Sequence, residues 1–160
     1  MLGAVKVRPP LPEYLQFLSP YAPRIRELAL AARKLVLEAA PDSMELIYDA
    51  YNAVAVGYSF TGRPSDAFVH IAVYAGWVNL GFNHGAGLPD PCGVLRGSGR
   101  RVRHIRIEEP GDLEEPAVRP LVRAAMAQAA RPEGTGIKAT KGKSVVRAIY
   151  ARRRRPAGAS

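Results

Sequence analysis

Cysteine is almost absent from this chain of 160 residues, since Cys92 is the only one. A single cysteine cannot form an internal disulfide, so the sequence gives no sign of an oxidising compartment. The N-terminal segment also lacks an apolar run of signal-peptide length before its first prolines, Pro9 and Pro10. We therefore expect a cytoplasmic protein that does not associate with membranes.

Charge is missing from one internal stretch, residues 67–89, which contains no Asp, Glu, Lys or Arg. A stretch of this length invites comparison with a membrane span. Its polar residues His70, Asn79, Asn83 and His84, together with several glycines, favour a buried hairpin instead. The stretch is therefore expected to lie inside a globular domain.

What the sequence does contain is enough apolar material for one domain of ordinary size, with 48% hydrophobic residues and 23% charged residues. The net charge of +9 is concentrated near the C-terminus, where residues 132–160 carry eight Lys or Arg and one Glu. We expect an N-terminal arm over residues 1–18, a domain over residues 19–131 and a basic extension over residues 132–160.

The sequence predicts an α+β fold, with a helix, an antiparallel sheet of about five strands, a second helix and the basic extension. Apolar residues at three- and four-residue spacing indicate the first helix, and alternation of apolar and polar residues indicates the strands. The arm carries Pro9, Pro10 and Pro12, which favour extended backbone. The helices are expected over residues 21–39 and 117–130, and the strands over residues 44–50, 53–60, 67–75, 77–82 and 102–107. Residues 144–150 are expected to form a final strand or an ordered lid.

The two faces of the predicted sheet differ chemically. One face is aliphatic and is expected to pack on helices; it includes Val54, Val56, Tyr58, Phe60, Val69, Ile71, Val73, Val78, Leu80 and Phe82. The opposite face combines small residues with aromatic and polar ones. Our leading hypothesis is a non-enzymatic binding module in which this second face accepts a small ligand, a protein segment or a second copy of the chain. Its predicted ligand-binding residues are Trp77, Tyr74, His70, Asn79 and, from the adjoining loop, Arg101. The alternative is that another element of the chain covers this face.

The basic extension predicts a second mode of binding. Its positive side chains could hold a polyanion such as RNA or DNA without base selectivity. The residues concerned are Lys138, Lys141, Lys143, Arg147, Arg152, Arg153, Arg154 and Arg155. The alternative is that Val145, Val146 and Ile149 dock on the domain and leave the arginines solvated.

Chemical motifs are sparse, and the sequence assigns no catalytic residue, no metal site and no cofactor. His84, Asp90 and Cys92 are close in sequence but match no familiar metal-ligand spacing. Cys92 has no identifiable base, and there is no Gly-x-Ser-x-Gly motif. The loop over residues 84–101 holds five glycines and several arginines, so an enzyme that holds an anionic substrate there is an alternative.

Residues 78–107 resemble the YdhG-like family of uncharacterised bacterial domains. The matching pattern runs from an apolar strand through Gly-Ala, Leu and Asp-Pro to Leu-x-Gly-x-Gly and a basic strand. It includes Leu80, Phe82, Gly85, Ala86, Leu88, Asp90, Pro91, Leu95, Gly97, Gly99, Arg103 and Ile105. The resemblance extends more loosely over residues 14–131 and implies an α+β domain with helices packed on an antiparallel sheet. It implies no catalytic residues.

One branch of that family has been described as a frataxin-like iron chaperone, and the resemblance makes this a further alternative. Such an activity is expected to use clustered surface carboxylates, because iron held by oxygen ligands needs several of them. The first predicted helix departs from this pattern. It offers Glu27 and Glu38 among four basic residues, Arg24, Arg26, Arg33 and Lys34.

Overall fold

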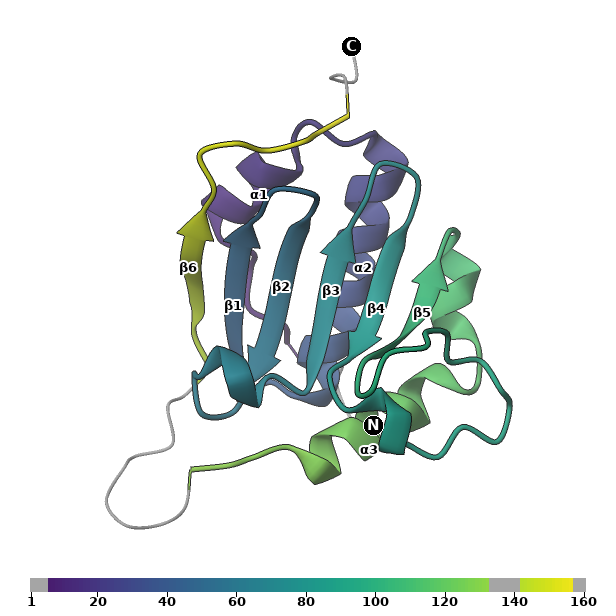
Figure 1. Ribbon diagram of the computed structural model, residues 1–160. Coiled ribbons are helices and arrows are strands. Elements are labelled where there is room, and N and C mark those ends of the chain that lie inside the picture. Colours follow the sequence, from purple (N-terminus) through teal and green to yellow (C-terminus); the bar gives the residue numbers. More distant parts are fainter. Residues whose placement is uncertain (1–5, 133–141, 157–160) are drawn as a thin grey trace.

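The computed structural model describes residues 6–132 and 142–156, and these residues have an α+β fold (Figure 1). The helices are α1 (Pro12–Leu18), α2 (Pro23–Ala39) and α3 (Val118–Gln128). The strands are β1 (Met44–Asp49), β2 (Val54–Ser59), β3 (Val69–Val73), β4 (Val78–Phe82), β5 (Arg103–Ile107) and β6 (Ser144–Ile149). Short 3₁₀ turns are η1 (Pro64–Asp66), η2 (Gly85–Gly87) and η3 (Pro110–Glu114). None of the described helices is long and apolar enough to cross a membrane.

The strands form one sheet in the order β5–β4–β3–β2–β1–β6. Neighbouring strands are antiparallel from β5 to β1, whereas β6 runs parallel to β1. The expected α+β fold is confirmed, but the sheet is mixed and has six strands rather than about five antiparallel ones. Residues 144–149, which were expected to form a strand or a lid, are a strand.

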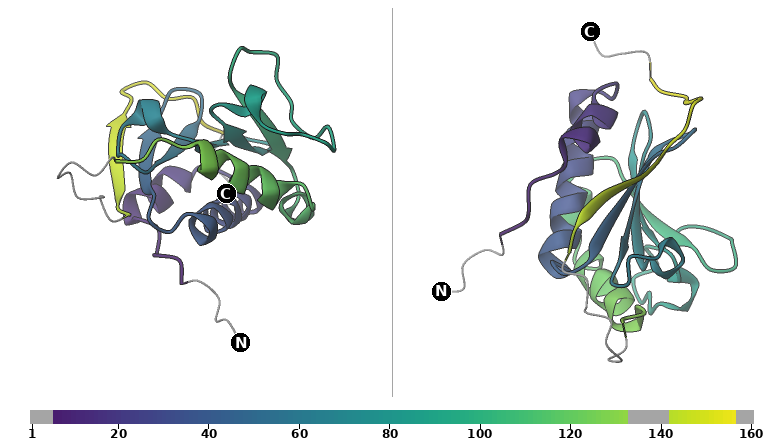
Figure 2. Two further views of the ribbon diagram at one scale, coloured as in Figure 1. Left: turned by 90° about the horizontal axis from the view of Figure 1, so that it is seen from below. Right: turned by 90° about the vertical axis from the view of Figure 1, so that its left-hand side faces the viewer.

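The helices cover one face of the sheet and leave the other without a helix (Figure 2). Helix α2 contacts β3 and β4, and α3 packs against α2 near the ends of the strands. The aliphatic side chains predicted to face the helices are all buried in one core with α1, α2 and α3. This face assignment is therefore confirmed, because a period of two along each strand settles which side chains point inward.

The N-terminal arm is partly helical, which corrects the extended conformation expected from its prolines. Pro12 occupies the first turn of α1, where the missing N–H of proline would have no intrahelical partner anyway. Tyr14, Phe17 and Leu18 on this helix are buried in the core. The arm is consequently part of the domain rather than a segment lying on its surface.

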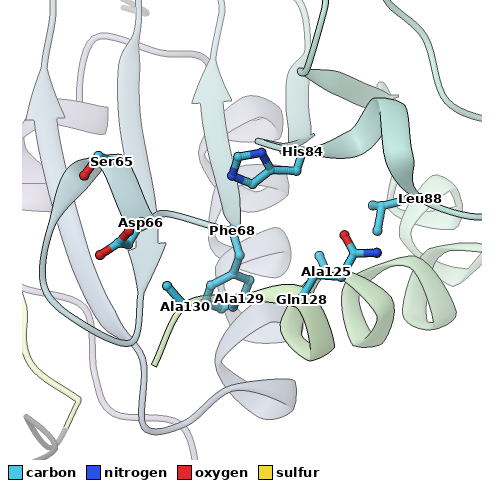
Figure 3. Close-up of a pocket in the computed structure, with 9 residues that line it drawn as sticks. All are labelled: Ser65, Asp66, Phe68, His84, Leu88, Ala125, Gln128, Ala129 and Ala130. Atoms are coloured by element: carbon cyan, nitrogen blue, oxygen red, sulfur yellow. The ribbon is translucent and has the colours of Figure 1, made fainter. Parts of the chain in front are cut away.

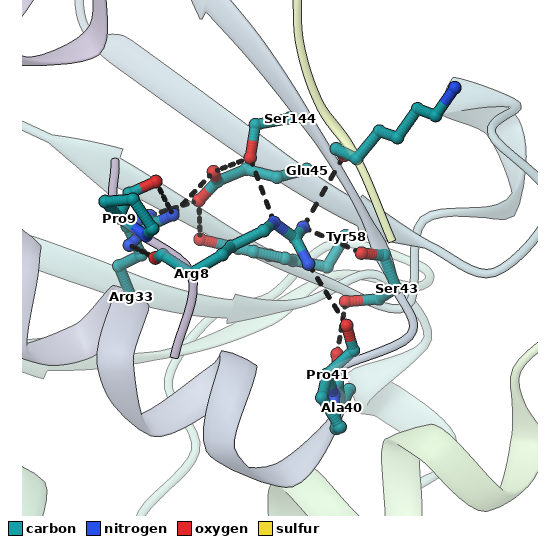
Figure 4. A network of polar contacts seen from close by, with 10 residues as sticks. Arg8, Pro9, Arg33, Ala40, Pro41, Ser43, Glu45, Tyr58 and Ser144 are labelled. Atoms are coloured by element: carbon teal, nitrogen blue, oxygen red, sulfur yellow. Dashed lines mark hydrogen bonds and ion pairs between the residues drawn. The ribbon is translucent and has the colours of Figure 1, made fainter. Parts of the chain in front are cut away.

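Glu45 on β1 lies at the centre of a buried polar network (Figure 4). Its side chain is 0% exposed and forms an ion pair with Arg33 of α2, whose Nε donates to Glu45 Oε2 at 2.8 Å. Tyr58 Oη donates to the same oxygen at 2.8 Å, and Ser144 Oγ donates to Oε1 at 2.7 Å. Burial and the nearby carboxylate raise the pKa of Tyr58, so its hydroxyl stays protonated and able to donate. Arg33 is thus 3% exposed, in contrast to its neighbour Lys34, whose side chain is 71% exposed.

The network also ties the N-terminal arm to the last strand. Arg8 Nε donates to Ser144 Oγ at 3.1 Å, and another nitrogen of Arg8 donates to the carbonyl of Ser43 at 2.8 Å. Arg33 Nη1 donates to the carbonyl of Arg8 at 2.9 Å. Segments that are remote in sequence therefore meet around one carboxylate.

Asp49 provides a second buried carboxylate at the other end of β1. It is 3% exposed, and each of its two carboxylate oxygens accepts a hydrogen bond from an arginine beyond β6, one from Arg153 and one from Arg155. Arg155 also donates to the carbonyl of Ala50 at 2.7 Å and of Tyr51 at 3.1 Å. The chain after β6 is thereby fixed across the end of the sheet.

The Glu45→Gln variant tests the network. Glutamine leaves the buried Arg33 without a countercharge, so the free energy of unfolding should fall by about 3–5 kcal/mol in urea denaturation. The matched control is Glu38→Gln, because Glu38 forms only a surface contact of 4.0 Å with Lys34 and its loss should cost about 0.5 kcal/mol or less. Equal effects of the two substitutions would contradict the central role of Glu45.

Candidate functional site

The face of the sheet that carries no helix presents two transverse rows of side chains. The strand registers place Leu46, Gly57, His70, Gly81 and His104 side by side in the first row. They place Tyr48, Ala55, Ala72, Asn79 and Arg106 in the second row. We call this surface the open face.

The first row is partly covered by the connection between β2 and β3. Leu46 is 1% exposed although it points away from the helices. Gly57 lies close to Ala67, since a Cβ added at Gly57 would be 3.4 Å from the Cβ of Ala67. Gly62 lies close to Met44 in the same way, since a Cβ added at Gly62 would be 2.8 Å from the Met44 Sδ. Residues 61–67 therefore fold back over this end of the sheet. The alternative that the chain covers its own second face therefore holds for one end of the sheet.

His70 lies flat against β4 rather than projecting toward solvent. Its Nδ1 is 2.8 Å from Asn83 Oδ1, and a Cβ added at Gly81 would lie only 2.0 Å from its Nε2. Burial lowers the pKa of the His70 imidazole, and the hydrogen bond with Asn83 opposes this effect. The small residue at position 81 thus makes room for a neutral imidazole.

The aromatic residues lie at the opposite end of the open face, beside the turn between β3 and β4. The rings of Tyr74 and Trp77 stack with centroids 5.1 Å apart, and the Arg106 guanidinium carbon lies 4.0 Å from the Trp77 ring centroid. Because β4 lies between β3 and β5, Trp77 is held between Tyr74 on one side and Arg106 on the other. Arg106 Nε is in turn 2.9 Å from Glu108 Oε1. The result is a fixed ladder of side chains across the sheet.

Of the five predicted ligand-binding residues, the structure groups four on the open face and places the fifth elsewhere. Tyr74 and Trp77 are in direct contact, and Asn79 lies in the row next to them. The Oδ1 atom of Asn79 is buried and accepts no hydrogen bond from the residues that the structure describes. Arg101 lies exposed just before β5 begins, whereas Trp77 lies level with the opposite end of that strand.

Arg106, which was not among the predicted ligand-binding residues, lies beside Trp77. This contact depends on the pairing register of β4 and β5, which could not be predicted from the sequence alone. The registered pair Asn79–Arg106 puts Arg106 diagonally opposite Trp77. The aromatic end of the face therefore carries a cation that sequence reasoning missed.

A hollow of about 590 Å³ lies at this end of the sheet, between two hairpin turns and the chain after β6. It is lined by Tyr21, Asn52, Tyr74, Ala75, Trp77, Arg154, Arg155 and Pro156. Two residues of the predicted ligand site and two of the predicted polyanion site thus meet in one place. We call this cavity the aromatic hollow.

The predicted polyanion residues divide into distinct groups. Arg153 and Arg155 bind Asp49, so they hold the chain to the domain. Exposed side chains are carried by Lys143, Arg147, Arg152 and Arg154. Lys138 and Lys141 lie outside the described residues. The expected docking of Val145 and Val146 is observed, because both are half-buried in β6, whereas Ile149 is 58% exposed.

A smaller cavity of about 120 Å³ lies between η1, η2 and the end of α3 (Figure 3). Its lining includes Ser65, Asp66 and His84. Asp66 Oδ2 accepts from Thr61 Oγ1 at 2.7 Å, and Ser65 carries its hydroxyl on the side away from His84. These three residues therefore lack the nucleophile–base contact that a catalytic triad needs.

The glycine-rich loop is organised by its own contacts. Both carboxylate oxygens of Asp90 accept backbone N–H groups, from Val94 at 2.9 Å and from Leu95 at 3.1 Å. Arg103 Nη1 donates to the carbonyl of Gly99 at 2.5 Å. Cys92 is an exposed free thiol. Within residues 6–132 and 142–156, no group of three or more His, Cys, Asp or Glu side chains could hold a metal ion.

The Gly81→Ala variant tests the packing of His70. The new methyl group would collide with the imidazole, so the free energy of unfolding should fall by about 1–3 kcal/mol. In a His70→Ala background the same substitution should cost much less, because the ring is gone. Equal costs in both backgrounds, measured by urea denaturation, would contradict this packing.

The depressed pKa of His70 predicts a pH dependence of stability. Between the native pKa and the unfolded value near 6.5, the unfolded chain binds more protons than the native one. The free energy of unfolding should therefore fall as the pH is lowered from about 7 through this window. His104 contributes in the same direction, because burial and neighbouring cations lower its pKa as well. The His70→Gln variant should show a shallower pH dependence than wild type, and an unchanged slope would refute the assignment.

Comparison of the chain with models of known protein families gives no match. Comparison with curated proteins and with solved structures also gives none.

Proposed function

We propose that the protein is a non-enzymatic binding module that holds a small ligand in the aromatic hollow. The observation that carries this proposal is the meeting of Tyr74 and Trp77 with Arg154 and Arg155 around one cavity of about 590 Å³. Ligand sites in proteins commonly enclose about 300–1,000 Å³ and combine aromatic walls with a few polar groups. The hollow has both properties, whereas the cavity beside His84 is much smaller.

The walls of the hollow are held in place before any ligand arrives. Tyr21 Oη donates to the carbonyl of Val73 at 3.1 Å, and Trp77 is fixed by its contacts with Tyr74 and Arg106. Arg155 anchors the tail side through Asp49. Prior ordering of these groups favours binding, because little conformational entropy is lost when the ligand enters.

The chemistry of the lining supports binding rather than catalysis. Among the described residues that line the hollow there is no carboxylate, histidine, serine or cysteine. These side chains supply most nucleophiles and general bases. The resemblance to the YdhG-like domains stays a prediction and assigns no residue a role, so the proposal rests on this geometry.

Polyanion binding through the tail is supported less well. Two of its eight positive residues, Arg153 and Arg155, are paired with Asp49 and are not free to hold phosphate groups. The exposed arginines that remain are distributed between β6 and the segment beyond it. This alternative therefore has fewer available charges than the sequence indicated.

The single tryptophan makes the proposal testable, because Trp77 contributes the only indole N–H signal in a ¹H–¹⁵N spectrum. Small aromatic compounds, both neutral and anionic, should shift this signal in a saturable way. Tyr74→Leu should weaken binding about tenfold, given that one aromatic contact is worth roughly 1–3 kcal/mol.

Tyr150→Leu is the matched control, because Tyr150 is exposed at the end of β6 and does not line the hollow. It should leave binding unchanged. The proposal would be abandoned if no compound moved the Trp77 signal, or if Tyr74→Leu and Tyr150→Leu had equal effects.

A further inference from the structure

The aromatic hollow has a free stacking surface on Tyr74 rather than on Trp77. Trp77 is enclosed by Tyr74 and Arg106, which lie on either side of it in the strand order β3–β4–β5. On the side of Tyr74 that faces β2, the pairing of Val73 with Val54 places Ala53 as the neighbour. Alanine is small, and among the described residues Trp77 is the only aromatic ring that stacks on Tyr74. A flat ligand can therefore lie against Tyr74 within the hollow.

A polar side chain stands close to this surface. Asn52 is an exposed residue of the turn between β1 and β2, and it lines the same cavity as Tyr74. Its amide carries both a donor and an acceptor group, which together match the edge of a heterocyclic base. A ring that stacks on Tyr74 can thus also be recognised along its edge.

The charge in the hollow is positive. Arg155 is committed to Asp49 and to backbone carbonyls, so its guanidinium serves the fold. Arg154 is anchored by its backbone N–H, which donates to the carbonyl of Tyr51 at 2.7 Å, while its side chain is exposed and lines the cavity. Among the described residues, no acceptor for the Arg154 guanidinium is found. Arginine in this situation is suited to a phosphate group, which it can bind through two nitrogens.

We infer that the ligand of the aromatic hollow is a nucleotide, with its base stacked on Tyr74 and its phosphate at Arg154. This inference rests on the proposed function and specifies its ligand. Aromatic stacking, an amide for the base edge and a guanidinium for the phosphate are the three contacts that such a ligand needs. The same chemistry is presented by a free mononucleotide and by a nucleotide within a single strand.

The test uses the full chain and follows Trp77 fluorescence and binding calorimetry with AMP, adenosine and inorganic phosphate. AMP should bind at least about tenfold more tightly than either adenosine or phosphate, because only AMP uses both Tyr74 and Arg154. Arg154→Gln should weaken AMP about tenfold and leave adenosine unchanged. The matched control is Arg152→Gln, which removes the same charge from an exposed residue outside the lining and should leave AMP binding as in wild type.

The outcomes separate this inference from the function on which it depends. If adenosine and other neutral aromatics bind through Tyr74 but AMP binds no more tightly, or if Arg154→Gln and Arg152→Gln behave alike, the nucleotide assignment is overturned and the binding module remains. If no compound binds, both are overturned. A short single-stranded RNA that binds much more tightly than AMP, with the same dependence on Tyr74 and Arg154, identifies a strand as the source of the nucleotide. Equal or weaker binding of the RNA identifies the free nucleotide.

Discussion

The ion pair between Glu45 and Arg33 is the interaction on which the arrangement of this domain depends. A carboxylate that is 0% exposed must be surrounded by donors, because an unpaired charge inside a protein is very costly. The donors come from α2, β2 and β6, and Arg8 of the N-terminal arm extends the same network. The requirement to satisfy one side chain therefore specifies how the two ends of the chain meet at β1.

Asp49 extends this logic to the end of the sheet at which the aromatic hollow lies. Because it lies four residues after Glu45 on the same strand, it points to the same side of the sheet and draws in Arg153 and Arg155 from beyond β6. This pairing carries the tail across the end of the sheet, where Arg154 and Pro156 complete a wall of the aromatic hollow. The basic extension is thus both a structural element and part of the candidate site.

Features that follow from local periodicity could be predicted from the sequence, whereas those that depend on long-range pairing could not. Alternating residues such as Val69, Ile71 and Val73 identify both the strand and its buried face. The burial of Arg33 depends on a partner twelve positions away, and the parallel pairing of β6 depends on a partner about one hundred positions away. The same limit applies to the candidate site. Tyr74 and Trp77 are neighbours across a short hairpin, so their proximity could be predicted from the sequence. The contact of Arg106 with Trp77 could not, because it depends on the pairing register of β4 and β5.

The parallel pairing of β6 with β1 has a consequence for synthesis. A chain that leaves the ribosome from its N-terminus exposes β1 long before residues 144–155 emerge. During that interval β1 is an unprotected sheet edge, and Asp49 has not yet met the arginines that neutralise it. A charged side chain at such an edge opposes pairing with the strands of other molecules. The carboxylate that later anchors the tail is therefore also a charge that disfavours intermolecular strand pairing at this edge before β6 is in place.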